Sequence, residues 1–348
     1  MTKRRQIEKA VNDLYEEGLF NGCVLVAVEG EILYSGAVGL ADDEAPLTVD
    51  TVFDIASVSK SFTAMAVMML QERGELDIDE TVDTYLEDFP YPDVTIRHLL
   101  HHTGGLPDYM ELFEEEWDTD YIASNSDLLE LLVENEPDVE FDANEQYEYS
   151  NTGYAILALV VEAVSGTEFA DFLKRNIFIP LGMTRTQVVN RRVNDPEIEN
   201  FAYGYVWDED EEEYYLPDDH EDYDYVVYLD GIQGDGAVCS TVVDLLKWDR
   251  ALYTNRLVSK DTINMLFTGT WTEDEEFVDY GMGWFLDWQE LEDEEQPAEV
   301  VYHTGDWGGY SSAIVRYMNY DMTVIILSNC EDDLEPLYTQ IDEILMEE

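Results

Sequence analysis

The chain has 348 residues, of which 45% are hydrophobic, so it is long and apolar enough to fold around a substantial core and is not expected to be disordered. It carries 80 acidic and 17 basic residues, which gives a net charge of −63 at pH 7. A surface of that charge repels nucleic acid and anionic membranes, so neither is an expected partner.

No run of about 18 apolar residues occurs, and no apolar segment follows the basic N-terminus. We therefore expect no membrane span and a cytoplasmic protein, or a periplasmic or secreted one if a signal peptide has been removed. The three cysteines, Cys23, Cys239 and Cys330, are far apart and lack metal-ligand spacing. We interpret them as buried small hydrophobic residues and predict neither a disulfide framework nor a metal site.

The acidic residues are concentrated in runs at 112–120, 207–225 and 290–296. We expect these runs to be solvated loops and faces, arising from adaptation to salt or from deliberate resurfacing, with cations close to the surface. A calcium-binding surface is a weaker interpretation, because GDGAVCS at 234–240 falls short of a calcium-loop pattern.

In chain order, apolar periodicity predicts a helix over residues 7–18 and two strands over 22–30 and 31–40. From residue 57 to about 190 the pattern is chiefly helical. Helices that begin at a serine or end at a proline or glycine are predicted over 126–137 (from Ser126 to Pro137), 151–166, 240–255 (from Ser240) and 259–267 (from Ser259).

Strand patterns return at 280–288, 300–306, 311–318 and 322–329, before a last amphipathic helix over 335–346. The predicted fold class is α+β: an antiparallel sheet built from the N- and C-terminal segments and flanked by helices, with a mostly helical insertion. We expect residues 1–60 and 232–348 to form the sheet subdomain and residues 61–231 the helical one.

The segment DIASVSKSFTAM at 54–65 places Ser57 three residues before Lys60, so that on a helix both side chains share one face. A serine becomes a nucleophile when a base takes its proton, and a buried lysine is such a base because burial lowers its pKa. The apolar run at 62–70 predicts that burial. Ser57 at a helix start would add a free N–H for an oxyanion. The alternative is that Ser57 only caps the helix and Lys60 extends into solvent.

Two further motifs favour the chemical interpretation. Tyr149-Ser150-Asn151 lies in the turn before an apolar helix, and His303-Thr304-Gly305 ends a late strand. In this order the three motifs resemble S-x-x-K, Y-x-N and K/H-T-G of the serine β-lactamase and penicillin-binding-protein superfamily. The segments around these motifs, together with two further segments, resemble the class C β-lactamase-like hydrolases, which include esterases, D-amino-acid peptidases and D,D-carboxypeptidases. The segments that carry this resemblance are 53–67, 95–109, 176–186 and 303–312.

The resemblance implies that Ser57 forms an acyl-enzyme, that Lys60 is its base or a proton relay, and that Tyr149 shares proton transfer. A tyrosine acts as a base only if a neighbouring ammonium, here Lys60, stabilises its phenolate. Otherwise Tyr149 is a buried aromatic residue. Asn151 would bond the substrate and Lys60; the alternative for Asn151 is a helix N-cap, and both roles are compatible.

By the same resemblance, His303, Thr304 and Gly305 bind substrate, and the backbone N–H groups of Ser57 and Asp306 form the oxyanion hole. An aspartate at 306 departs from the expected pattern, because its carboxylate is unfavourable beside an oxyanion unless it points away.

Lysine is usual in β-lactamases where this chain has His303, and a largely neutral histidine favours esters or peptides without an obligatory carboxylate. Weak β-lactam turnover stays open, with Arg316 as a nearby charge, and a histidine without a role is the alternative for position 303. The second HTG, at 102–104, is interpreted as a structural turn. Four aromatic residues are candidates to line the cleft or to pack in the core: Tyr109, Trp117, Trp307 and Tyr310.

We therefore expect a serine hydrolase that acts on a small-molecule ester, peptide or β-lactam in a cleft between the two subdomains and needs no metal or organic cofactor. The alternative is a catalytically silent scaffold that uses the same fold to bind a penicillin-like ligand or a peptide.

The charge of −63 predicts that salt stabilises the fold. Added salt screens the repulsion between carboxylates, since the Debye length falls from about 10 Å at 0.1 M to about 3 Å at 1 M. The melting temperature is therefore expected to rise between 0.1 and 3 M NaCl. A melting temperature that stays constant over this range contradicts salt adaptation.

Overall fold

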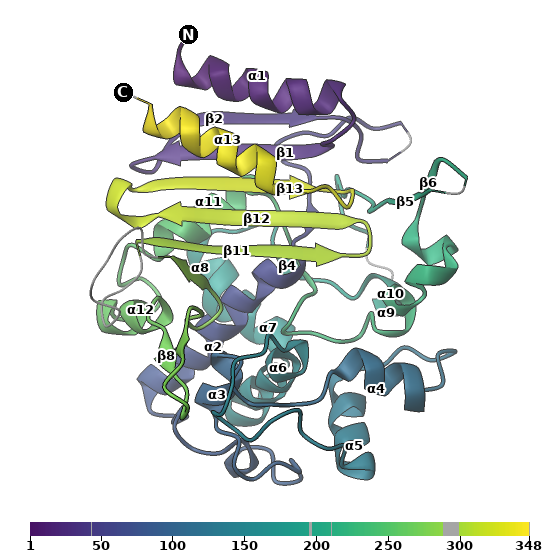
Figure 1. Cartoon of the computed structure of the whole chain (residues 1–348), viewed down its shortest axis with the longest axis vertical. Coiled ribbons are helices and arrows are strands. Elements are labelled where there is room, and N and C mark those ends of the chain that lie inside the picture. The colour runs from purple at the N-terminus through teal and green to yellow at the C-terminus, as the bar shows by residue number, and fades with distance from the viewer. Residues whose placement is uncertain (43, 195–196, 210, 288–298, 348) are drawn as a thin grey trace.

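A computed structural model describes residues 1–42, 44–194, 197–209, 211–287 and 299–347 of the chain. Its centre is a six-stranded antiparallel sheet in the order β10-β11-β12-β13-β1-β2 (Figure 1). The first strand of the chain pairs with the last one and the second strand pairs with the first, so both ends of the sequence build one sheet. The strands are β1 (Gly22–Val28), β2 (Glu31–Val38), β10 (Phe285–Asp287), β11 (Val300–Trp307), β12 (Tyr310–Tyr317) and β13 (Met322–Ser328).

Helices cover both faces of this sheet. Helices α1 (Lys3–Glu16) and α13 (Glu335–Met346) lie against one face, where Val24 and Val26 of β1 belong to their apolar cluster. Leu25, between these two valines, belongs to the large cluster on the other face. Successive side chains of a strand point to opposite faces, so a strand covered on both sides is apolar at nearly every position, as β1 and β13 are.

The centre of the second face is α2 (Lys60–Arg73), which is buried on every side from Lys60 to Leu70. It packs against α6 (Asn151–Ser165), and both belong to the largest apolar cluster of the described residues. The remaining α-helices are α3 (Ile96–Leu100), α4 (Tyr109–Glu116), α5 (Asn125–Asn135), α7 (Phe169–Leu173), α8 (Ile179–Leu181), α9 (Arg191–Asn194), α10 (Tyr225–Tyr228), α11 (Val242–Ala251) and α12 (Lys260–Leu266).

A second, three-stranded sheet leads into the beginning of α2. It consists of β3 (Phe53–Asp54), β7 (Val238–Ser240) and β4 (Gln187–Val188), and β7 lies between the other two. A 3-10 turn, η1 (Ala56–Ser59), joins β3 to α2. The hairpins β5 (Val206–Asp208) with β6 (Glu213–Tyr215) and β8 (Thr270–Trp271) with β9 (Phe277–Val278) complete the described strands.

The predicted α+β class is confirmed, and both termini contribute to the main sheet as expected. The strand predicted over 280–288 is wrong in extent, because β10 begins at Phe285 and residue 288 lies outside the described residues. The backbone turns at Gly283, where φ is +80° and an added Cβ would lie 2.8 Å from the carbonyl oxygen of Lys60. The division into two subdomains stays a prediction.

Three helix starts differ from the sequence prediction. Helix α1 begins at Lys3 rather than at residue 7. Helix α5 is capped by Ser124 rather than Ser126, because Ser124 and Asp127 form a reciprocal capping box. Helix α11 is capped by Thr241 rather than Ser240. The Ser259 cap of α12 is confirmed.

The acidic run at 112–120 is not only a loop, because its first half continues α4 and buries Leu112 and Phe113. The run at 207–225 includes the β5–β6 hairpin, with residue 210 outside the described part, and the run at 290–296 also lies outside it. The three cysteines are buried and form no disulfide. Among the described residues, no helix is both long and apolar enough to cross a membrane.

An ion pair is completely buried between the main sheet and α11. Arg316 of β12 donates from Nε to Oδ1 of Asp249 at 2.6 Å, and both side chains are 0% exposed. Arg250 binds the other oxygen of Asp249 at 2.7 Å. Arg316 is therefore a structural residue, and the expectation that it supplies a charge near the substrate is corrected.

Loss of one partner of this pair leaves an uncompensated charge in the core. We expect Asp249→Leu to lower the free energy of unfolding by about 3–5 kcal/mol in urea titrations. The double variant Asp249→Leu/Arg316→Met should be less destabilised than Asp249→Leu, because it removes both buried charges. An Asp249→Leu protein within about 1 kcal/mol of wild type would contradict this role.

Candidate active site

Ser57 lies in the 3-10 turn η1, just before α2 rather than inside it. The residue before it, Ala56, has a positive φ of 44°, a conformation that costs free energy for any residue other than glycine. The backbone N–H of Ala56 donates to Oδ1 of Asp54 at 2.8 Å, which supports this bend. The bend places Ser57 in the lining of a pocket.

Lys60, the first residue of α2, is 0% exposed, so the alternative in which it extends into solvent is wrong. Its Nζ donates to Oγ of Ser57 at 3.0 Å, to Oδ1 of Asn151 at 2.8 Å and to the carbonyl oxygen of Asp235 at 2.9 Å. Burial lowers the pKa of Lys60 to about 8, although the charge of Asp235 opposes the shift. At mildly alkaline pH, the Lys60 amine is therefore neutral in a large fraction of the molecules.

Tyr149 lies on the other side of the lysine. Nζ of Lys60 is 4.9 Å from the centroid of the Tyr149 ring, and the phenol hydroxyl hydrogen-bonds to the Ser57 side chain. Burial raises the pKa of Tyr149, while the bond to Ser57 lowers it. The phenol is therefore in its neutral form at pH 7 and carries one proton.

The turn before α6 gives Ser150 and Asn151 different functions. Ser150 caps the helix by accepting from the N–H of Gly153, so the N-cap alternative for Asn151 is wrong. As the first residue of α6, Asn151 directs its side chain to Lys60.

His102, in the second HTG motif, supports the turn that precedes α6. His102 accepts from the N–H of Ser150 at Nδ1 (3.0 Å), its carbonyl accepts from the N–H of Glu148 (3.0 Å), and its ring lies 4.4 Å from that of Tyr149. Burial and the charge of Lys60 hold the pKa of His102 well below its usual value. A neutral His102 is therefore available as an acceptor, which agrees with the structural role predicted for this motif.

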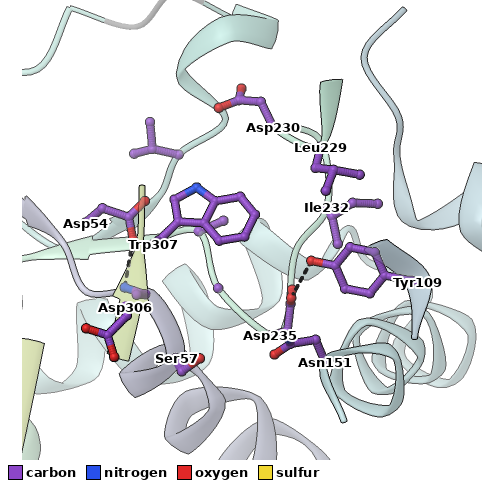
Figure 2. Close-up of a pocket in the computed structure, with 14 residues that line it drawn as sticks. Asp54, Ser57, Tyr109, Asn151, Leu229, Asp230, Ile232, Asp235, Asp306 and Trp307 are labelled. Atoms are coloured by element: carbon purple, nitrogen blue, oxygen red, sulfur yellow. Dashed lines mark hydrogen bonds between the residues drawn. The ribbon is translucent and has the colours of Figure 1, made fainter. Parts of the chain in front are cut away.

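Strand β11 passes directly beside the Ser57 turn. A Cβ atom at Gly305 would lie 2.7 Å from the backbone nitrogen of Ser57 and 2.8 Å from the carbonyl oxygen of Ile55, so only glycine fits there. The next residue, Asp306, lines the same pocket as Ser57 (Figure 2). Its Oδ1 accepts from Oγ of Ser311 at 3.1 Å, on the face of β11 opposite Gly305, so the carboxylate points away from Ser57.

His303 does not reach the pocket, and the prediction that it contacts substrate directly is corrected. It is 0% exposed and on the same side of β11 as Gly305, and its Nε2 lies 3.0 Å from the hydroxyl of Tyr280. Burial and the charge of Lys60 lower the pKa of His303 to about 3. Thr304 is half-buried, and its carbonyl accepts from Nδ1 of His303; neither residue is among those that line the pocket.

The pocket beside Ser57 opens to solvent, and its empty space amounts to about 540 Å³ when the open solvent at its mouth is included. Ser57, Asn151 and Asp306 are the predicted site residues in its wall, and Lys60 is buried behind Ser57. Trp307 and Tyr109, two of the predicted cleft aromatics, line it as well; Trp117 and Tyr310 do not. The full lining is Asp54, Ala56, Ser57, Tyr109, Asn151, Val189, Leu229, Asp230, Ile232, Asp235, Gly236, Ala237, Asp306 and Trp307.

Sequence reasoning missed Asp235 as a site residue. Its carbonyl holds Lys60, and its carboxylate accepts from the hydroxyl of Tyr109 at 2.8 Å (Figure 2). The signal available in the sequence is the glycine-flanked Gly234-Asp235-Gly236 turn, in the segment that falls short of a calcium-loop pattern.

Comparisons with known proteins agree with this geometry. A sequence profile of the family described as "Beta-lactamase" matches residues 7–345. A penicillin-binding protein of Bacillus subtilis is 44% identical over 96% of this chain and 73% of its own length. The esterase EstB of Burkholderia gladioli is 36% identical over 55% of this chain, which spans about half (52%) of that protein.

Solved structures show the same fold. A penicillin-binding protein from Bacillus halodurans superposes with a TM-score of 0.82 at 26% identity, over 97% of this chain and 98% of that one. D-amino acid amidase from Ochrobactrum anthropi, complexed with D-phenylalanine, superposes with a TM-score of 0.77 at 25% identity, over 99% and 98% of the two chains. The profile match and the Bacillus subtilis relative together cover nearly the whole sequence, and the chain therefore belongs to the beta-lactamase family of serine hydrolases.

Proposed function

We propose that this protein hydrolyses esters or amides through an acyl-enzyme formed on Ser57. The observation that carries the proposal is the fully buried Lys60, whose Nζ lies 3.0 Å from Oγ of Ser57 and whose pKa is lowered to about 8 by burial. A neutral amine in hydrogen-bond contact with a serine hydroxyl is the arrangement that activates a serine nucleophile.

In the first step, neutral Lys60 takes the proton of the Ser57 hydroxyl while Oγ bonds to the carbonyl carbon of the substrate. The negative charge that develops on the carbonyl oxygen is stabilised by the backbone N–H groups of Ser57 and Asp306. The close approach of Gly305 to the Ser57 nitrogen supports this pairing of donors. The tetrahedral species then expels the leaving group, which receives a proton through Tyr149, while the phenol regains a proton from Lys60.

In the second step, a water molecule takes the place of the leaving group and loses its proton along the same route. The ester bond to Ser57 breaks, the acid product leaves, and Oγ recovers its proton. Asn151 keeps Lys60 in position throughout, because its Oδ1 accepts from Nζ whether the lysine is charged or neutral.

Lys60 is a better base than Tyr149 in this site. Burial raises the pKa of Tyr149, whereas it lowers that of Lys60. A phenolate is therefore not favoured at neutral pH, and we assign Tyr149 to proton relay.

Small esters and amides fit the site better than β-lactams with a carboxylate. Neutral, buried His303 offers no positive charge at the pocket, and Arg316 is bound to Asp249 in the core. Relatives named as an esterase and a D-aminopeptidase, the latter 27% identical over 68% of this chain, support both substrate types. The silent-scaffold alternative is not favoured, because the nucleophile, the buried amine and the phenol are all in contact.

Replacement of Ser57 by alanine removes the nucleophile. We expect Ser57→Ala to lose at least about a thousandfold in kcat/KM for p-nitrophenyl acetate and D-alanyl p-nitroanilide, and to lose mass labelling by a fluorophosphonate. Ser61→Ala is the matched control, because Ser61 is buried one turn further on and donates to the carbonyl of Val58. Equal rates for wild type and Ser57→Ala contradict the mechanism.

The lowered pKa of Lys60 sets the pH dependence of acylation. Because the amine must be neutral to accept a proton, kcat/KM for a neutral ester should rise about tenfold per pH unit from pH 5 to 7 and level off above pH 8. Lys60→Arg should lower the rate over the whole range, since a guanidinium does not deprotonate. A profile that is flat between pH 6 and 9 would exclude Lys60 as the base.

A further inference from the structure

Helix α1 carries its charges in the reverse of the order that favours a helix. Arg4 and Arg5 lie in its first turn, whereas Glu16 and Glu17 lie at its C-terminal end. The N-terminus of a helix is the positive end of its dipole, so arginines there and glutamates at the C-terminus are repelled by the helix ends. Within α1, the first turn holds no acidic residue and the last turn no basic one that would offset this repulsion. This charge order lowers the stability of the helix and needs a separate explanation.

The four side chains have no partner in their own chain. All are exposed, and within the described part of the chain none of them forms a hydrogen bond or an ion pair. Other cations of α1 are used internally, because Lys9 pairs with Asp13 and Lys3 donates to the carbonyl oxygen of Leu345 at 2.7 Å. Every other arginine forms an ion pair or a hydrogen bond: Arg73, Arg97, Arg175, Arg185, Arg191, Arg192, Arg250, Arg256 and Arg316. In a chain with 80 acidic residues, two arginines without a carboxylate partner are candidates for contact with another molecule.

The exposed side of α1 faces away from the rest of the molecule. Its buried side belongs to the apolar cluster on the main sheet, and Figure 1 shows the helix at the end of the molecule opposite α4 and α5. At its C-terminal end, α1 borders a groove that contains three exposed apolar side chains: Tyr15, Leu40 and Tyr214. Exposed apolar side chains that lie together mark protein interaction sites. The helix therefore ends beside a surface that is suited to contact another protein.

A second copy of the chain is the occupant that matches the charge order of α1. Arg4 and Glu16 are twelve residues apart, which is about 18 Å along a helix. If two α1 helices lie antiparallel about their midpoints, the arginines of each copy face the glutamates of the other at both ends. Near the midpoint, Glu8 then faces Asn12, which is uncharged. The arrangement has two-fold symmetry and closes at two copies.

The antiparallel arrangement also accounts for the groove. The arginine side chains of one copy reach the end of the other helix, where their methylene stems contact the exposed ring of Tyr15 while the guanidinium groups bind Glu16 and Glu17. Opposite ends of the two helix dipoles lie together, which offsets the repulsion within each helix. An anionic membrane or a nucleic acid would satisfy the arginines, but the glutamates and the net charge of −63 would repel it.

We propose that the protein forms a two-fold symmetric dimer through α1, in which Arg4 and Arg5 of each copy pair with Glu16 and Glu17 of the other. The inference does not rest on the proposed function, because α1 contributes no residue to the lining of the Ser57 pocket. The net charge opposes association of two copies at low ionic strength. The dimer is therefore expected to form once salt screens this long-range repulsion.

Sedimentation equilibrium measures the proposed dimer. In 0.5 M NaCl the Debye length is about 4 Å, so distant charges on two copies no longer interact, whereas an ion pair in contact keeps part of its attraction. For wild type we expect a dissociation constant of about 10–100 μM, as for a small, transient interface. A protein that sediments as a monomer up to about 500 μM overturns the proposal.

Two charge-reversal variants make the test specific to α1. Arg4→Glu/Arg5→Glu makes both ends of the helix negative, and Glu16→Arg/Glu17→Arg makes both ends positive. Each variant alone should raise the dissociation constant at least about tenfold, because every charge pair across the interface becomes repulsive. An equimolar mixture of the two variants should form a heterodimer about as tightly as wild type, because both ends of the interface are again attractive.

The matched control is Lys174→Glu/Arg175→Glu, which replaces two adjacent exposed cations outside α1 and changes the net charge by the same amount as Arg4→Glu/Arg5→Glu. The control should dimerise as wild type does. Equal dissociation constants for these two variants, or a mixture of the α1 variants that stays monomeric, overturn the α1 pairing. If circular dichroism shows that a reversal variant does not fold, Arg4→Gln/Arg5→Gln takes its place and should raise the dissociation constant at least about threefold; no rise overturns the pairing as well.

Discussion

The burial of one amine, that of Lys60, is the constraint on which the rest of the site depends. An amine removed from water needs acceptors for its hydrogens, and here they come from three distant segments: Ser57 in η1, Asn151 in α6 and the carbonyl of Asp235. Helix α2 is buried from Lys60 to Leu70, and Lys60 itself is not exposed to solvent. The same contacts that satisfy the amine therefore also assemble the nucleophile and its neighbours.

The two histidines near the amine are kept neutral. His102 and His303 are both buried, and burial together with the charge of Lys60 lowers the pKa of each, so neither carries a proton that competes with Lys60. A lysine at position 303 would place a second cation beside Lys60 and depress its pKa further. With a neutral histidine at position 303, burial is what lowers the pKa of Lys60, and the charge of Asp235 limits this decrease.

Much of the fold was predictable because it follows from local patterns, namely the apolar strands β1 and β11 to β13, the buried helix α2 and the final helix α13. The Ser57–Lys60 contact was predictable from their spacing only in combination with the motifs at 149–151 and 303–305. The contribution of Asp235 was not, since its main contact with Lys60 is through a backbone carbonyl, which any residue type supplies. Nor does the sequence indicate that the side chain of His303 is completely buried, because the burial of a side chain near a strand end depends on what packs against it.

Asp306 shows how the site accommodates a carboxylate next to its oxyanion donors. Its side chain alternates along β11 with those of His303 and Gly305, and its Oδ1 accepts from Ser311 on the face of the sheet opposite Ser57. The backbone N–H that we assign to the oxyanion hole lies in the plane of the sheet, whereas the carboxylate projects from that plane. The strand therefore offers a backbone donor to the developing negative charge and directs the negative side chain elsewhere, so the backbone of residue 306 matters to the proposed chemistry more than its side chain does.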